Sequence, residues 1–455
     1  MVSYFAQGQC VLRRFDMPLG MSKNAFQNSG GAAATQFALE QQQSGDIYGF
    51  PTLTSEGDQF EAFVDAFAAY VADVTGDGGI TPSQTFMTET GTTGLHTNSS
   101  YRYRGFAIDE NGIAIAFPSA QTQMLRLDTD TLQFSTTDHP TTSFTNTTNY
   151  WGGGFSQWIQ AVYAPSNGCF YGVPDYAYRN IKYDPNADSF SDWDVPNQSN
   201  LSRYQRGLYF EGFIWCFSQS RLMKIDTEDD STTVVSKSGL NYSWVVGPER
   251  CFYAATKTSI LKYNPSTDSI STLVSGFTAG GDGGVTKLQV ASNGKFYAIP
   301  TSANSTYTDG PYSIIEFDPI SETVNLIGLT ADATNTRWKR PSAQYGYSGM
   351  LCLPDGRLAI TTSYDCRTYN GSSWIGGDRG PVIFNPSTGT FEARGYLSAG
   401  PSQWGFQLKP LMGKKGNLIP TPYRTPYSSG YGFSYYFDDA PIAPPSRLFA
   451  SPFMA

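Results

Sequence analysis

The chain alternates short apolar runs with turn residues along most of its length. Residues 285–328 show the pattern clearly: apolar runs are separated by Asn293-Gly294, by a longer polar loop and by Asp318-Pro319. Asn-Gly between apolar runs favours a tight hairpin because both residues tolerate a positive φ. Asp-Pro begins a turn because proline presets φ and the aspartate side chain accepts a backbone hydrogen bond. This stretch therefore predicts four consecutive strands.

The same unit recurs along the chain. Its first turns stand at residues 111–112, 167–168, 211–212, 249–250, 293–294, 355–356 and 415–416. In each copy an apolar strand follows the first turn, a third strand ends in a turn led by Asp or Asn, and a fourth strand comes next. In the last copy the fourth strand is predicted at residues 447–451.

Seven units of four strands are typical of a β-propeller, in which each unit forms one sheet, called a blade. The sequence therefore predicts an all-β fold, a seven-bladed β-propeller of four-stranded antiparallel blades, preceded by an N-terminal arm and one amphipathic helix. The predicted domains are the arm at residues 1–57, the helix with an acidic Gly/Asp loop and a linker at 58–98, and the propeller at 99–455.

The first 98 residues differ in character from the repeats. Residues 22–44 are small, polar and Gln-rich, and a segment with so few apolar side chains becomes ordered only against a partner. Two interpretations remain open for the arm: attachment to an assembly, or a disordered tail. Residues 58–74 repeat apolar side chains every three or four positions. This spacing predicts a helix whose apolar stripe packs on the propeller or on a partner subunit.

An acidic loop follows the predicted helix. Asp73, Thr75 and Asp77 stand at alternate positions, like the first ligands of an EF-hand-like calcium loop, and Gly78 permits the sharp turn between them. The likeness ends at the twelfth position, where Gln84 replaces the bidentate glutamate. A weak calcium site and a plain Gly/Asp-rich linker both fit these residues. Calcium is the only cofactor that the sequence suggests.

Charge and composition narrow the kinds of partner. The formal net charge is -9 and the pI is about 4.8, so a nucleic-acid backbone is not an expected partner. No apolar run approaches the ~20 residues that span a bilayer, and membrane insertion is not expected. The N-terminal stretch also lacks the apolar core of a secretory signal.

The chain contains six cysteines. Cys169, Cys216 and Cys251 fall at or within predicted strands, where we expect buried, reduced thiols that pack as small apolar side chains. Cys352 and Cys366 lie in one predicted blade, and a disulfide between them remains open.

Loop length differs between the two faces of the predicted propeller. Turns after the first and third strands are short, whereas several connections after the second and fourth strands, such as residues 362–381, are long and rich in Tyr, Trp, Ser, Gly and Asn. Such loops on a rigid scaffold are typical of recognition sites. The candidate ligand-binding residues are Tyr176, Tyr178, Tyr307, Trp338, Tyr364, Trp374 and Tyr427. Further aromatic candidates in these loops are Trp151, Tyr312, Tyr369 and Tyr423. Contact with a glycan, contact with a protein and packing alone remain open interpretations.

Catalysis has less support in the sequence. The chain has two histidines, His96 and His139, so it offers little for a His-activated nucleophile or a His-rich metal centre. Glycoside cleavage needs two carboxyl groups about 5–10 Å apart. The sequence does not place any pair of the loop aspartates that close: Asp175, Asp282, Asp309, Asp365 and Asp378. No catalytic residue is assigned, and a polysaccharide-degrading enzyme remains an alternative.

The repeat NGKFYAIP…IIEFDP…TVNLI resembles the blade layout of kelch and NHL-like propellers, although it lacks the Gly-Gly pair of kelch blades. The whole chain, a Gln/Ala/Gly-rich arm and a helix ahead of a lysine-poor propeller, is similar to bacteriophage virion proteins of the tail or head surface. This resemblance implies a structural or adhesion subunit on the surface of a phage-like virion, present in multiple copies. Its N-terminal segment would mount it on other virion proteins, and its propeller would recognise a host-surface glycan or protein. A purely architectural subunit and an extracellular protein remain alternatives.

Overall fold

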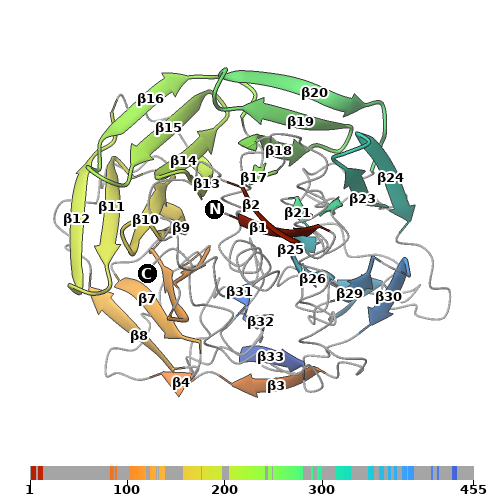
Figure 1. Ribbon diagram of the computed structural model, residues 1–455. Coiled ribbons are helices and arrows are strands. Elements are labelled where there is room, and N and C mark those ends of the chain that lie inside the picture. The colour runs from red at the N-terminus through yellow and green to blue at the C-terminus, as the bar shows by residue number, and fades with distance from the viewer. Residues whose placement is uncertain are drawn as a thin grey trace.

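The computed structural model is an all-β protein whose sheets follow one another around a ring (Figure 1). The structure describes residues 2–6, 9–13, 82–86, 88–89, 103–138, 157–196, 204–240, 244–279, 288–290, 295–299, 313–328, 347–352, 358–362, 367–369, 374–376, 382–393, 411–412, 418–419 and 433–437, with short gaps in the longer ranges. Within these residues the strands form six four-stranded sheets, one five-stranded sheet and two separate hairpins. The predicted helix at 58–74 and the acidic loop lie outside the described residues.

Four successive sheets use their strands in chain order. The first contains β9 (Trp158–Ala164), β10 (Cys169–Pro174), β11 (Arg179–Asp184) and β12 (Ser189–Asp194). The second contains β13 (Tyr204–Phe210), β14 (Phe213–Ser218), β15 (Arg221–Asp226) and β16 (Thr232–Ser236). The third contains β17 (Val245–Val246), β18 (Phe252–Ala255), β19 (Ser259–Asn264) and β20 (Ser269–Ser275). The fourth contains β21 (Gln289–Val290), β22 (Phe296–Ala298), β23 (Ser313–Asp318) and β24 (Thr323–Gly328).

The other sheets depart from this plan. One contains β25 (Tyr347–Cys352), β26 (Leu358–Thr362), β29 (Val382–Asn385) and β30 (Thr390–Ala393), and the hairpin of β27 (Arg367–Tyr369) and β28 (Trp374–Gly376) is inserted between β26 and β29. The five-stranded sheet contains β5 (Ala107–Ile108), β6 (Ile113–Ala116), β7 (Gln123–Asp128), β8 (Gln133–Asp138) and β4 (Thr88–Glu89). The second hairpin is β1 (Val2–Ala6) with β2 (Gln9–Arg13).

The last sheet closes the ring with a strand from the beginning of the chain. It contains β31 (Leu411–Met412), β32 (Leu418–Ile419) and β33 (Phe433–Phe437), and its outermost strand is β3 (Pro82–Phe86) (Figure 1). The sequence predicts residues 447–451 for this position, and that prediction is wrong. Successive hairpins can be read from local turn residues, whereas pairing between the two ends of a chain leaves no such local signal.

Pairing is antiparallel throughout the four-stranded sheets, so the repeated four-stranded antiparallel units predicted from the sequence are confirmed. Glu211-Gly212 is a type I′ turn, because both of its residues have a positive φ, 52° and 80°. The Asn-Gly turns differ from the expected geometry. Gly112 and Gly168 have φ values of 81° and 71°, but Asn111 and Asn167 are not left-handed.

The core lies between neighbouring sheets and is strongly aromatic. Phe252 is fully buried, with its ring centroid 5.2 Å from that of Phe210 and 5.3 Å from that of Trp215 on the preceding sheet. The first strands of adjacent sheets also meet, because Gln160 Nε2 donates a 3.1 Å hydrogen bond to the carbonyl of Gly207. Gly207 leaves no room for a side chain, since a Cβ there would overlap Val173. Tight packing of this kind fixes each sheet against the next.

Candidate functional site

The turns after the third strands are built alike and are compact. Asp184 Oδ1 accepts hydrogen bonds from the backbone N–H of Asn186 and Ala187, at 2.9 and 3.2 Å, as the Asp-Pro signal predicts. The fifth residue of these turns has a positive φ in five sheets: Asp188, Asp230, Asp268, Glu322 and Gly389. This end of the sheets therefore carries short, internally satisfied turns.

The connections after the second strands lie at the opposite end of the sheets. Between β26 and β29, a stretch that the sequence predicted as a loop contains the β27–β28 hairpin. Tyr369 and Trp374 are direct partners in its register, as are Thr368 and Ile375. The signal for this hairpin was present in the sequence, since Asn370-Gly371 follows Tyr369. The described part of this connection is therefore a strand pair, whose register places two candidate aromatic residues at facing positions.

The β10–β11 connection is held firmly at the same end of its sheet. The backbone N–H groups of Asp175 and Ala177 both donate to the carbonyl of Gln157, at 2.9 and 3.2 Å. The carbonyl of Tyr178, a half-buried candidate residue, accepts a 2.9 Å hydrogen bond from the N–H of Val195. Asp175 is buried. These bonds fix Tyr178 on a rigid connection.

Of the predicted ligand-binding residues, the structure describes Tyr178 and Trp374. Tyr178 belongs to the β10–β11 connection, and Trp374 begins β28, paired with Tyr369. The remaining predicted binding residues lie outside the described residues: Tyr176, Tyr307, Trp338, Tyr364 and Tyr427. The predicted calcium ligands Asp73, Thr75 and Asp77 also lie outside them, as do the loop aspartates other than Asp175.

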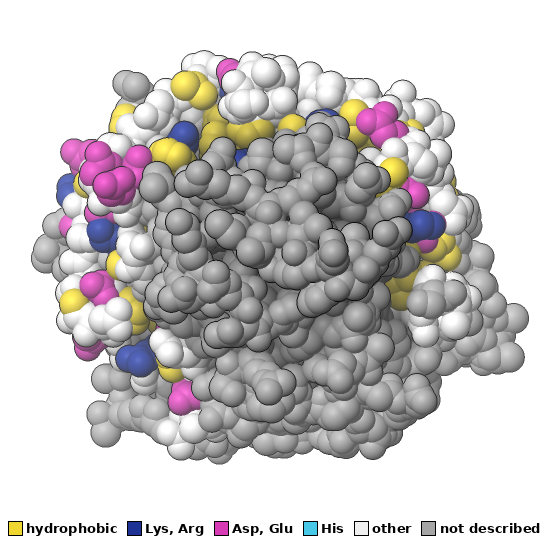
Figure 2. All heavy atoms as spheres, viewed as in Figure 1, with side chains coloured by type: hydrophobic (Ala, Val, Ile, Leu, Met, Phe, Trp, Pro, Cys, Tyr) yellow, Lys and Arg dark blue, Asp and Glu magenta, His cyan; other side chains and the backbone are white. Residues whose placement is uncertain are grey.

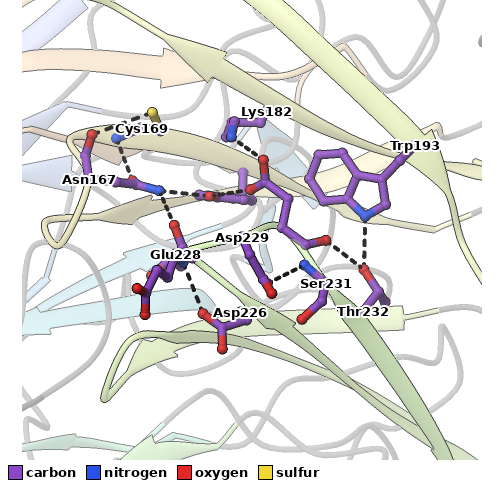
Figure 3. A network of polar contacts seen from close by, with 12 residues as sticks. Asn167, Cys169, Lys182, Trp193, Asp226, Glu228, Asp229, Ser231 and Thr232 are labelled. Atoms are coloured by element: carbon purple, nitrogen blue, oxygen red, sulfur yellow. Dashed lines mark hydrogen bonds and ion pairs between the residues drawn. The ribbon is translucent and has the colours of Figure 1, made fainter.

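A polar network between the sheets β9–β12 and β13–β16 escaped the sequence analysis (Figure 3). Asp230, at the positive-φ position of the β15–β16 turn, accepts a 2.8 Å hydrogen bond from the hydroxyl of Tyr171 and forms an ion pair with Lys182. Trp193 Nε1 donates to Thr232 Oγ1 at 2.8 Å, at the end of the same turn. The turn of one sheet is therefore bonded to three strands of the preceding sheet.

The other members of this network tie the turn to the first hairpin of the preceding sheet. Asn167 Nδ2 donates to the carbonyl of Thr227 at 2.7 Å and to the Tyr171 hydroxyl at 2.8 Å. Burial is the main reason that the pKa of Tyr171 is raised above its ordinary value. The only sequence signal for the network was the recurrence of Asp at the fifth position of these turns.

Acidic side chains gather on the rim where β12, β15 and β16 lie, at the left of Figure 2. The β15–β16 turn contributes Asp226, Glu228, Asp229 and Asp230. Glu228 and Asp229 are exposed, whereas the carboxylate of Asp230 is engaged by Lys182 and Tyr171. Asp226 Oδ1 accepts a 2.9 Å hydrogen bond from the N–H of Glu228, so it supports the turn. The carboxylates of this turn therefore either support the local structure, as Asp226 and Asp230 do, or face solvent, as Glu228 and Asp229 do.

The described cysteines match the expectation of buried, reduced thiols. Cys169, Cys216 and Cys251 are all buried thiols. Burial, with a smaller contribution from Asp184, raises the pKa of the Cys169 thiol to about 11. Burial alone raises the pKa of Cys216. A thiol with a raised pKa is a poor nucleophile, so these residues have a packing role.

The part of the chain that the structure describes offers few residues for metal binding or membrane insertion. No group of three or more His, Cys, Asp or Glu residues there is arranged to hold a metal ion. No helix in this part is long and apolar enough to cross a membrane. His96 and His139 lie outside it.

No protein-family model matches the chain, and no curated protein sequence matches it. Solved structures do resemble it in fold. A streptogramin B lyase has a TM-score of 0.52 at 10% identity, over 78% of this chain and 97% of the lyase. Virginiamycin B lyase from Staphylococcus aureus has a TM-score of 0.50 at 11% identity, over 78% and 99%. The WD40 propeller domain of Doa1 has a TM-score of 0.49 at 12% identity, over 79% and 98%.

At these identities the likeness is one of fold alone. The chain is an all-β protein of the β-propeller class, with repeated four-stranded antiparallel sheets.

Proposed function

We propose that the protein is a structural and adhesion subunit of a phage-like virion, with a seven-bladed propeller that recognises a host-surface glycan or protein. Its N-terminal segment mounts it on other virion proteins, in multiple copies on the virion surface. The phage assignment rests on the resemblance in organisation and composition. The recognition role rests on the observation described next.

The β27–β28 hairpin carries the proposal. It is inserted at the end of its sheet opposite the compact turns, and its register sets Tyr369 against Trp374. Tyr and Trp side chains give a large contact area with little loss of conformational entropy on binding. The β10–β11 connection, which holds Tyr178, belongs to the same end of the sheets and adds a second fixed contact. Many weak contacts of this kind gain strength from copy number on a particle.

We also propose that calcium binds the loop at Asp73, Thr75 and Asp77 in a structural role. There it would support the N-terminal segment that attaches the protein to the virion. It would take no part in recognition.

The test replaces residues 363–380 with a short Asn-Gly turn in the full chain. Thermal unfolding checks that the variant folds, and binding of the purified protein to host cells measures attachment. We expect normal unfolding and loss of most of the attachment. The single variant Trp374→Ala should weaken attachment by roughly 10- to 100-fold, the cost of removing one aromatic anchor.

A matched control changes the opposite end of the sheets. Glu322→Gly alters a compact β23–β24 turn and should leave attachment unchanged. Full attachment by a folded protein without residues 363–380 would refute the recognition role. Attachment that is lost equally in the Glu322→Gly control would show that recognition does not belong to the proposed face.

A further inference from the structure

The outermost strand of the last sheet, β3, comes from the N-terminal part of the chain. β3 pairs with β33 over its whole length, from Pro82 opposite Phe437 to Phe86 opposite Phe433. Immediately afterwards, β4 pairs in parallel with β8, the outer strand of the sheet that begins the ring. Residues 82–89, which we call the closing segment, therefore join two sheets that are distant in sequence.

Strand pairing ties the closing segment to these sheets. Its sequence, PSQTFMTE, has one carboxylate, no lysine or arginine and mostly small or polar residues. Such a strand tolerates exposure to water, so its release costs less than release of an apolar inner strand. Its removal would leave β33 and β8 with unpaired edges, and an unpaired strand edge is a site at which another strand adds.

The connections on both sides of the closing segment are long. The first runs from Arg13, where β2 ends, to Pro82, and the second runs from Glu89 to Ala107, where β5 begins. The second connection is anchored from Tyr103 onward, because this buried residue donates a hydrogen bond to the carbonyl of Gln123. Fully extended, the stretch from Glu89 to Tyr103 spans roughly 45 Å. The closing segment can therefore reach a neighbouring molecule while β5 remains in its own sheet.

We propose that the edge of β33 is a strand-binding site and that the closing segment of a second copy of this chain can occupy it. The occupant has the right sequence, since it is the strand that already pairs with this edge, with Ser83 opposite Tyr436 and Gln84 opposite Tyr435. Within one chain a tether gives an effective concentration in the millimolar range. Exchange between copies is therefore favoured where copies are crowded or are folded together at high concentration. Such exchange is independent of the proposed recognition role.

The test introduces cysteine pairs at facing positions: Ser83→Cys with Tyr436→Cys, and Gln84→Cys with Tyr435→Cys. Facing residues in an antiparallel pair have Cα atoms about 4.5–5.5 Å apart, within the range of a disulfide. Because hydrogen-bonded and non-hydrogen-bonded pairs alternate, the two double variants cover both geometries. Each variant is refolded at low and at high concentration, oxidised, and separated by size without reductant.

We expect a monomer-sized cross-linked product after dilute refolding and cross-linked dimers after concentrated refolding, with about a tenfold rise in the dimer fraction. The four single-cysteine variants control for the native cysteines and should not give this rise. Cross-linked product that stays monomer-sized at every concentration would overturn the proposal.

A second measurement avoids cysteine altogether. Two differently tagged copies of the natural chain are refolded either together or separately before mixing, and one tag is captured. Co-capture after joint refolding supports exchange. Because N–H groups that bond to β33 alternate along β3, either Ser83→Pro or Gln84→Pro removes one of them, and that variant should abolish co-capture. Co-capture that persists in both folded proline variants, or equal capture in both protocols, would assign association to another surface.

Discussion

The hydroxyl of Tyr297 donates a 2.7 Å hydrogen bond to Oε2 of Glu316, the residue directly opposite it on β23. In three preceding sheets the same pair of positions holds an aromatic residue and a lysine. There the lysine Nζ lies 5.0–6.0 Å from the ring centroid, in the pairs Tyr171–Lys182, Trp215–Lys224 and Tyr253–Lys262. The fold thus keeps an aromatic–charge pair at this position and reverses the sign of the charge in one sheet.

Glu316 should make the stability of the protein sensitive to acid. Burial raises the pKa of this carboxyl, but hydrogen bonds from Lys295 and Tyr297 outweigh that effect and hold the pKa below its usual value. A carboxyl with a depressed folded-state pKa contributes stability above the unfolded-state pKa, about 4.3. That stability is lost as the pH falls through the folded-state value.

Urea unfolding between pH 7 and pH 3 measures this contribution. We expect Glu316→Gln to be less stable than the natural protein at pH 7, by about 1–3 kcal/mol. The difference should shrink as the pH falls below 4. A constant difference over the whole range would show that Glu316 acts through its shape and not through its charge.

Asp230 should connect two sheets energetically. Replacing it with asparagine leaves Lys182 without its ionic partner and weakens the hydrogen bond from Tyr171. We expect Asp230→Asn to lower the free energy of unfolding by about 1–3 kcal/mol. Glu228→Gln in the same turn is the matched control, because it removes the same charge from an exposed side chain. The idea fails if the two variants have equal stability in chemical denaturation.

Gly207 should not accept a side chain. A Cβ at this position would overlap Val173, a fully buried residue of the neighbouring sheet. We expect Gly207→Ala to lower the free energy of unfolding by about 1–3 kcal/mol, as overpacking of a core does. The double variant Gly207→Ala with Val173→Ala should recover part of this loss relative to Val173→Ala alone. Simple additivity of the two losses would contradict the steric explanation.

Substitutions at Glu322 and Gly389 test backbone strain, because they should change the free energy of unfolding in opposite directions. They are the fifth residues of equivalent turns, with φ values of 52° and 66°. A left-handed conformation costs a non-glycine residue roughly 1 kcal/mol. We therefore expect Glu322→Gly to raise the free energy of unfolding by up to about 1 kcal/mol and Gly389→Ala to lower it by about the same amount. Changes of equal sign in thermal unfolding would rule out strain as the cause.

The repeated sheets could be predicted because their signals are local. Asn167-Gly168 and Asp184-Pro185 each indicate a turn from neighbouring residues. In the structure Gly168 has a positive φ, and Asp184 accepts the expected backbone hydrogen bond from Asn186. The pairing of β3 with β33 and the bond between Tyr171 and Asp230 join residues far apart in sequence, and no local pattern reports them. The β27–β28 hairpin was missed for a different reason. Its Asn370-Gly371 signal lies within a long stretch rich in Gly, Ser and Asp, a composition that favours a loop.

The position of β3 early in the sequence also determines when the ring of sheets can close during protein synthesis. β33 is translated long after β3, because almost all of the other sheets lie between Phe86 and Phe433 in sequence. At the usual rate of synthesis this delay is on the order of tens of seconds. Throughout that time β3 lacks its partner strand β33, while the intermediate sheets emerge and fold. The ring therefore becomes whole only after β33 has been translated, and a chain terminated before Phe433 would contain folded sheets but no closed ring.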